Sequence, residues 1–245
     1  MNTDDYLAKD PGFSSLTNFA DRFTENHVVL AMHAAVPLGL TPEIVHLLRR
    51  NFVVRAAWIA EADLLLSPLC REAGDEYYQI QPDIRDMLYQ ELLLDPEFGI
   101  DRIKDIARFL YAYSDRQLNL TANSVQQTFF EVQKLAALAY LDPPSAAEAI
   151  AREMQAAQEQ ENKSDTMRIA RITDALSTPL IAEDDVLIYA AGVQYWSDRN
   201  FARAKEMFDQ LGTGPTVQVG RINLPLPPIE VTKIIKIALL SALKT

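Results

Sequence analysis

The stretch Leu69-Cys-Arg-Glu-Ala-Gly-Asp-Glu-Tyr-Tyr-Gln-Ile80 decides how the first half of this chain is interpreted. It places a Gly74-Asp75 turn between two short segments, and the second segment carries two consecutive tyrosines. Glycine and aspartate are typical turn residues, and aromatic side chains are enriched in strands. The stretch therefore predicts a β-hairpin.

The flanking sequence predicts helices on both sides of this hairpin. Thr41-Pro42 is a favourable helix start, because threonine can cap the first turn and proline suits the first helical position. A helix from residue 41, a second over 58–66, the hairpin and a further helix over 83–93 follow in order. Helices followed by a two-stranded wing and another helix predict a winged-helix-like N-terminal half.

Helical periodicity is also strong further along the chain. Apolar residues recur three and four positions apart, which is the spacing of one helix face. The residues that carry this pattern are Ile103, Ile106, Ala107 and Leu110, and then Val125, Phe129, Val132, Leu135, Ala136 and Ala139.

Residues 187–211 carry four positions of the tetratricopeptide repeat. Gly192, Tyr195, Ala204 and Phe208 stand at the offsets of that repeat, and Asn200 is placed to cap its second helix. The glycine would let two helices approach closely, while Tyr195 and Phe208 would fill the space between them. An ordinary helical hairpin whose aromatic side chains form its core remains the alternative, because a single repeat cannot bury its own faces.

Prolines and polar runs suggest where the chain divides. Asp142-Pro143-Pro144 should stop one helix, and Ser145 with Glu148 should open the next as a capping box. The polar run over residues 155–164 is interpreted as a helix end and an exposed loop, and as the best candidate for a domain boundary. A second hairpin is expected around Gly220-Arg221, where glycine suits the first central position of a type II′ turn.

The predicted fold is therefore mainly α, with a winged-helix-like N-terminal half, a helical-hairpin (TPR-like) C-terminal half and two short β-hairpins. Four segments are expected: an N-terminal extension (1–26), a winged-helix-like helical domain (27–118), a helical TPR-like domain (119–212), and a last segment (213–245) with a hairpin, a proline-rich link and a C-terminal helix.

Composition limits the classes of function. The 245 residues carry a formal net charge of −11, which disfavours binding to a phosphate backbone. The single cysteine, Cys70, has no partner for an internal disulfide, and the N-terminal residues do not resemble a secretory signal. A cytoplasmic location without a membrane span is expected.

Motifs that carry chemistry are missing from the sequence. It contains no phosphate-binding loop, dinucleotide fingerprint, nucleophile elbow, zinc-protease motif or EF-hand. His27, His33, His46 and Cys70 are spaced by six, thirteen and twenty-four residues, which fits no zinc pattern. We therefore expect no catalytic residues, no cofactor and no metal.

Residues 52–72, which run from Phe52-Val-Val-Arg-Ala-Ala-Trp58 to Leu69-Cys-Arg-Glu72, resemble a module of multidomain bacterial proteins, chiefly cyanobacterial ones. In those proteins the module is joined to caspase-like peptidase, TIR or formylglycine-generating-enzyme-like domains. The similarity continues through residues 83–86, 95–99, 135–140 and 187–192. The wing and the helix after it are also similar to the winged-helix segment of STAND ATPases.

This resemblance implies a sensor, adaptor or regulatory role, with catalysis residing in a separate domain. We accordingly expect a non-enzymatic protein–protein interaction module of a bacterial signalling or defence system, acting on an effector of the peptidase, TIR or NTPase type. Large aromatic side chains that escape burial would anchor such a partner, and the candidates are Trp58, Tyr78 and Trp196.

Two alternatives from other functional classes stay open. A winged helix could read nucleic acid through Arg49, Arg50 and Arg55. Residues 41–96, however, contain five arginines, no lysine and ten acidic residues, which gives 5 − 10 = −5. An unrecognised hydrolase could use acidic residues and a histidine such as His33.

The C-terminal sequence carries one further expectation. Residues 231–243 are apolar around most of a helix, which suggests burial on two sides, either in the C-terminal core, in a partner or in a second copy of the chain.

Overall fold

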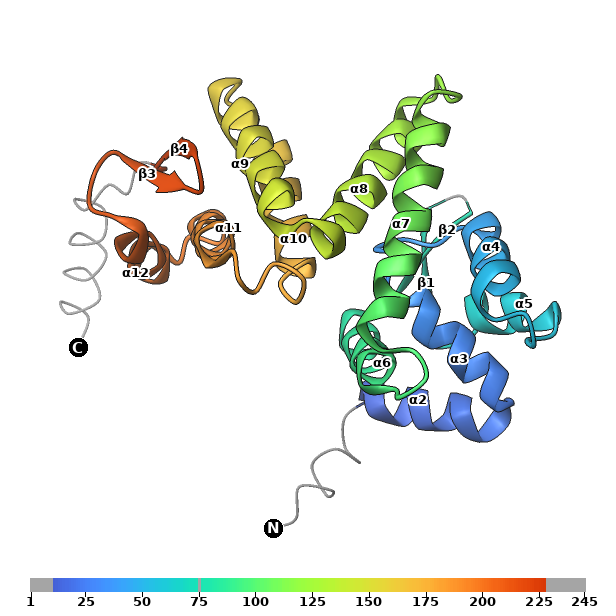
Figure 1. Ribbon diagram of the computed structural model, residues 1–245. Helices are drawn as coiled ribbons and strands as arrows, with labels where there is room; N and C mark the ends of the chain where they lie inside the picture. Colours follow the sequence, from blue (N-terminus) through green and yellow to red (C-terminus); the bar gives the residue numbers. More distant parts are fainter. Residues whose placement is uncertain (1–10, 75, 228–245) are drawn as a thin grey trace, which may run out of the picture. The chain divides into compact units, whose positions relative to one another are not determined.

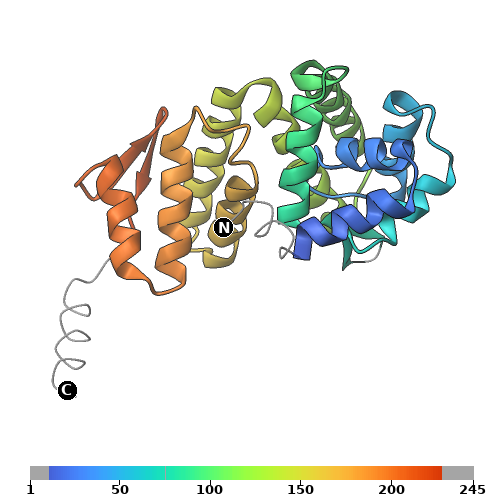
Figure 2. The same cartoon turned by 90° about the horizontal axis from the view of Figure 1, so that it is seen from below.

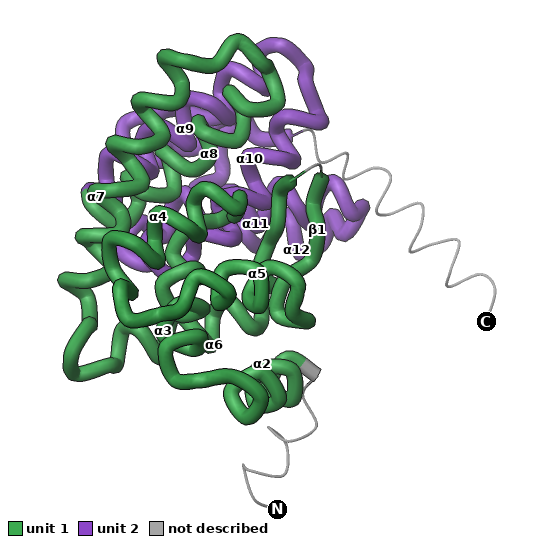
Figure 3. Tube along the Cα trace, turned by 90° about the vertical axis from the view of Figure 1, so that its right-hand side faces the viewer, with its two compact units in different colours: residues 1–141 green, residues 142–245 purple. Residues whose placement is uncertain are grey.

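The computed structural model describes residues 11–74 and 76–227 (Figure 1). The chain separates into two compact units, residues 1–141 and residues 142–245, which Figure 3 shows in different colours. The described residues are mainly helical, with two short antiparallel strand pairs. This confirms the predicted fold class of a mainly α protein with two short hairpins.

Unit 1 begins with helices and contains the first hairpin. Its elements are α2 (Pro11–Arg22), α3 (Glu25–Ala34), α4 (Pro42–Phe52), α5 (Ile59–Leu65), β1 (Cys70–Gly74), β2 (Tyr77–Ile80), α6 (Pro82–Leu94), α7 (Gly99–Leu118) and α8 (Ser124–Leu141).

The segment from α3 to β2 has the element order of a winged helix. Leu40, between α3 and α4, pairs with Tyr78 of β2 as an isolated antiparallel bridge. Its amide donates to the Tyr78 carbonyl over 2.8 Å and its carbonyl accepts from the Tyr78 amide over 2.9 Å. Leu40, a single residue of the α3–α4 loop, thus pairs with β2 in the place where a third strand would lie.

The start of α4 follows from its first two residues. The hydroxyl of Thr41 accepts the amide of Ile44 over 3.2 Å, and Pro42 occupies the first turn, as the sequence predicted. One face of α4 then buries Ile44 and Leu48 completely. The wing is attached to the same core through Ile80 at the end of β2, while most of β1 faces solvent.

Long helices complete unit 1. The predicted face of Ile103, Ile106, Ala107 and Leu110 is buried along α7. In α8 the predicted face is correct at Leu135, Ala136 and Ala139, but Val125 is 64% exposed because it lies in the first turn of the helix. Helices α7 and α8 pack against each other along their lengths.

Unit 2 contains two helical hairpins and the second β-hairpin. Its elements are α9 (Pro143–Glu159), α10 (Lys163–Ala175), α11 (Asp184–Ser197), α12 (Phe201–Leu211), β3 (Thr216–Val219) and β4 (Ile222–Pro225). Figure 2 shows the four helices side by side with the hairpin against them. Strands β3 and β4 pair from Thr216↔Pro225 to Val219↔Ile222. Gly220 has a φ of 57°, which its place in the turn of this hairpin requires.

The division between the units falls after Leu141. This differs from the expected division between residues 118 and 119, because α7 and α8 form one packed pair within unit 1. It also differs from the expected boundary in 155–164, where only three residues separate α9 from α10.

The capping box predicted at Ser145 is wrong. Helix α9 begins at Pro143, and Asp142 is its N-cap. One carboxylate oxygen of Asp142 accepts the amide of Ser145 over 3.2 Å, and the other accepts the Ser145 hydroxyl over 2.6 Å. The acid thus caps the free amide of Ser145, and the two prolines that follow α8 occupy the first turn of α9.

The predicted contact between Gly192 and Phe208 is present in unit 2. A Cβ on Gly192 would meet the Phe208 ring at 2.5 Å, so only glycine allows this packing of α11 on α12. The second aromatic partner was predicted wrongly. Tyr189, fully buried, lies with its ring 5.5 Å from that of Phe208, whereas Tyr195 is half-buried beneath the Arg203 guanidinium. Asn200 caps α12 as predicted.

Some predicted features fall partly or wholly outside the described residues. Within the predicted N-terminal extension, residues 11–22 form α2, whereas residues 1–10 lie outside. The C-terminal helix expected over residues 231–243 also lies outside. In the described part of the chain, no helix combines the length and the apolar composition that a bilayer span requires.

Candidate protein-interaction surface

Helix α5 turns one apolar face inward and another toward solvent. Ala60 and Leu64 are fully buried in the core of unit 1. On the opposite face, Trp58 is 73% exposed and Leu66 is 79% exposed, with Ala62 between them. The backbones of Trp58 and Leu66 are helical, so the three side chains follow one another at four-residue intervals. We call Trp58, Ala62 and Leu66 the α5 stripe.

Two more exposed apolar side chains lie beside the α5 stripe in the sequence. Val54, four residues before Trp58, is 71% exposed, and Ile59 follows Trp58 directly. Single exposed apolar residues are common on proteins, but a group of them marks an interaction site. In a winged helix this last helix before the wing is the one that enters a DNA groove. Here it has the sequence IAEADLL, without a lysine or arginine.

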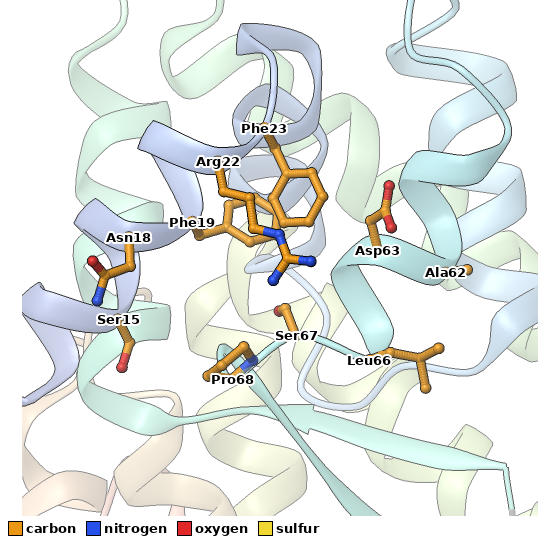
Figure 4. A pocket seen from close by; sticks show the side chains of 10 residues that line it. All are labelled: Ser15, Asn18, Phe19, Arg22, Phe23, Ala62, Asp63, Leu66, Ser67 and Pro68. Atoms are coloured by element: carbon orange, nitrogen blue, oxygen red, sulfur yellow. The ribbon is translucent and has the colours of Figure 1, made fainter.

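A groove of about 290 Å³ separates α5 from α2 (Figure 4). Ala62, Asp63 and Leu66 form its α5 side, and Phe19 and Arg22 stand on the α2 side. The groove therefore continues the α5 stripe toward the N-terminal helix. We call it the α2–α5 groove.

Arg22 is a charged residue of this groove that has no ion-pair partner among the described residues. Its guanidinium lies 5.3 Å from the centroid of the Phe23 ring and extends into the groove in Figure 4. Within the part of the chain that the structure describes, no carboxylate forms an ion pair with it. Asn18, one helical turn earlier, also lines the groove. Arginine and asparagine thus present donors to the same space.

Asp63, on the opposite side, is held by α3. Its carboxylate lies 3.3 Å from Nε2 of His27, and Nδ1 of His27 lies 2.8 Å from the Thr24 hydroxyl. A hydroxyl, a histidine and an acid in series are the groups that a hydrolase uses. Here, however, the Phe23 ring stacks on the buried His27, and neither Thr24 nor His27 lines the α2–α5 groove. The three side chains therefore join α3 to α5, with His27 buried between the exposed Thr24 and the half-buried Asp63.

The arginines considered for nucleic-acid binding are not equivalent. The Nε of Arg49 is paired with Glu61, which also accepts from Nδ1 of His46 over 3.0 Å, and another Arg49 nitrogen donates to the Ala56 carbonyl. Arg49 is thus used within the fold, and only Arg50 and Arg55 are exposed.

His33, the histidine of the hydrolase alternative, is completely buried between α3 and α7. Its Nδ1 donates to the Val29 carbonyl over 2.8 Å, and its Nε2 faces a guanidinium nitrogen of Arg102 at 3.2 Å. The pKa of His33 is lowered to about 4, mainly by burial and also by the nearby Arg102 charge, while the hydrogen bond to Val29 opposes this change. His33 is therefore a neutral packing residue that accepts a hydrogen bond from Arg102.

The remaining candidate ligands also sit in packing positions. Burial raises the pKa of the Cys70 thiol to about 12, so the thiol is protonated at neutral pH. Among the described residues, no three histidine, cysteine, aspartate or glutamate side chains are grouped as a metal site would require.

The three aromatic residues predicted as anchors have different surroundings. Trp58 is largely exposed. Tyr78, in strand β2 of the wing, is half-buried and packs against the core of unit 1. Trp196, in unit 2, lines a pocket of about 450 Å³ with Lys163 and Pro227. The sequence did not single out Leu66 or Arg22, although the four-residue spacing of Trp58, Ala62 and Leu66 was a usable signal.

In unit 2 the β3–β4 hairpin covers one face of the helices. Strand β4 packs on α9, while β3 packs on α11 and α12. The Tyr189 hydroxyl donates to the Pro225 carbonyl over 2.6 Å and accepts from the Gln158 amide over 2.7 Å. Three side chains of the hairpin itself are buried, those of Val217, Val219 and Leu224. The chain itself thus occupies this face.

The sequence and fold of the chain were compared with known proteins. No protein-family model, no curated protein and no solved structure matches it.

Proposed function

We propose that this chain is a non-enzymatic adaptor or regulatory module that binds another protein through the α5 stripe. The observation that supports this most directly is the exposure of Trp58 and Leu66 on the helix that a winged helix uses for contacts. Tryptophan and its apolar neighbours supply much of the binding energy when they are desolvated at the centre of an interface.

The charge of α5 favours a protein over a nucleic acid. Glu61 and Asp63 are its only charged residues, and Arg49 nearby is already paired with Glu61. A phosphate backbone would meet two carboxylates on this helix and would lose the counterion release that drives nucleic-acid binding. A protein surface has no such requirement.

The resemblance to modules of bacterial signalling and defence proteins gives this role a setting. In that setting the chain would act in the cytoplasm on a separate effector of the peptidase, TIR or NTPase type. Its β3–β4 hairpin packs on three helices of unit 2, and the proposed contact lies in unit 1.

Site-specific photo-crosslinking in bacterial cells tests this function. A benzophenone amino acid would replace Leu66 in one variant and Ile181 in another, since Ile181 is exposed to a similar degree, 77%, but lies in unit 2. We expect a defined protein adduct from position 66 that position 181 does not give. Absence of an adduct at 66, or the same adducts from both positions, would refute the proposed contact.

A further inference from the structure

The α2–α5 groove has features that specify what kind of segment can enter it. Phe23, half-buried, lines the groove from the α2 side together with the buried Phe19, and the exposed Leu66 lines it from the α5 side. A groove whose walls are two helices offers the contacts that a third helix makes when it packs between them. A helix that binds here must therefore match both the shape and the charge of the groove.

The length of the α5 stripe matches two turns of such a helix. Trp58 and Leu66 are eight residues apart, which corresponds to about 12 Å along α5 at a rise of about 1.5 Å per residue. A partner helix with apolar side chains at positions i, i+4 and i+7 presents a stripe of about the same length. One of these side chains would enter the groove between Phe19 and Leu66.

The charge of the groove selects among such helices. Arg22 is exposed and has no ion-pair partner in the described residues, and its guanidinium lies over the apolar Phe23 ring. A guanidinium binds a carboxylate through two parallel hydrogen bonds. Asp63, on the opposite side, already accepts a hydrogen bond from Nε2 of His27 over 3.3 Å.

We infer that the α2–α5 groove binds an amphipathic helix of the protein partner, with apolar residues on the α5 stripe and a carboxylate on Arg22. This inference rests on the proposed function and specifies its partner. The acidic charge of the whole chain would repel an acidic helix elsewhere, which makes Arg22 a local determinant of where the helix lands.

A phage-displayed library of amphipathic helices, with the apolar face fixed in spacing and the flanking positions randomised, tests the inference. Panning on the intact chain should enrich aspartate or glutamate beside the apolar face. Panning on Arg22→Glu should instead enrich lysine or arginine. Enrichment of basic helices on the natural chain, or no change of preference with Arg22→Glu, would overturn the role of Arg22.

Binding of one enriched peptide then places it on the molecule. Trp58 and Trp196 are the only tryptophans, so in a Trp196→Phe background the emission reports Trp58 alone, and binding should shift it to shorter wavelength. Arg22→Glu should weaken binding by roughly 10-fold to 100-fold, the usual range for a hydrogen-bonded charge. Leu66→Asp should weaken it by at least about 10-fold, whereas Leu120→Asp, at a residue exposed to 68% elsewhere in unit 1, should not.

Other results of these measurements contradict the inference. Equal loss with Leu66→Asp and Leu120→Asp would show that the peptide binds elsewhere. A shift of Trp58 emission with vesicles of phosphatidylcholine and phosphatidylglycerol, but with no peptide, would identify the stripe as a membrane contact. If no helix is enriched while position 66 still crosslinks a protein in cells, the helical partner is wrong and the adaptor function stands. If neither occurs, both fall.

Discussion

His33 couples the stability of unit 1 to pH through a single side chain. Its pKa is about 4 in the folded protein and 6.5 when unperturbed, because the buried imidazole is neutral and accepts a hydrogen bond from Arg102. Between these values the unfolded chain binds a proton that the folded chain does not. The stabilising contribution of neutral His33 is therefore complete above about pH 6.5 and is lost as the pH falls toward 4.

We predict that this loss reaches roughly 3 kcal/mol near pH 4, since each unit of pKa shift corresponds to about 1.4 kcal/mol. Urea unfolding measured at pH 7 and pH 5 should show a smaller decrease in His33→Gln than in the natural chain, because glutamine does not titrate. Equal decreases in the two proteins would mean that His33 does not control the acid response.

At the scale of elements, the start of α9 depends on one exposed carboxylate. Asp142 accepts two hydrogen bonds from Ser145, and these bonds lower the pKa of the Asp142 carboxyl. We predict that Asp142→Ala destabilises unit 2 against urea, whereas Asp142→Asn retains most of the cap. Urea unfolding followed by Trp196 fluorescence measures this difference. An Ala variant as stable as the natural chain would show that the cap contributes nothing.

The same scale shows which features the sequence can predict. The wing was predictable because Gly74 and the tyrosines are local signals, and α4 was predictable because Thr41 and Pro42 act within one turn. The cap of α9 was misplaced because Asp142 and Ser145 are both good caps, and only the backbone path decides between them. Tyr189 and Tyr195 share α11, and the periodicity did not reveal which one meets Phe208.

The candidate site was predicted only in part, for a related reason. The sequence identifies Trp58 as a candidate anchor by its size, but it does not show whether the side chain is exposed. Arg22 and Leu66 are 44 residues apart in the sequence and meet only because α2 and α5 pack on the same core. No local pattern encodes such a groove, since it arises from two helices that are each explained by their own buried faces.

At the scale of the whole molecule, the two units should respond separately to substitutions in their cores. Tyr189→Phe removes a hydroxyl that bonds both Gln158 and Pro225, and it leaves these groups without a partner in unit 2. We predict a loss of roughly 1–3 kcal/mol in the unfolding transition reported by Trp196. Leu48→Ala, in the core of unit 1, should leave that transition unchanged. A shift of the Trp196 transition by Leu48→Ala would show that the units unfold together.

The bond between Tyr189 and Pro225 also bears on how unit 2 can evolve. Arrays of helical pairs usually gain or lose pairs by duplication, since each pair contacts only its neighbours. Here one hairpin touches α9, α11 and α12 at once, so the first and last pairs are tied to each other through it. A helical pair inserted between α10 and α11 would separate α9 from α11 and break the contacts that the hairpin makes with both helices. In the described part of unit 2, a further helical pair therefore cannot enter between the two present ones without breaking the contacts of the hairpin.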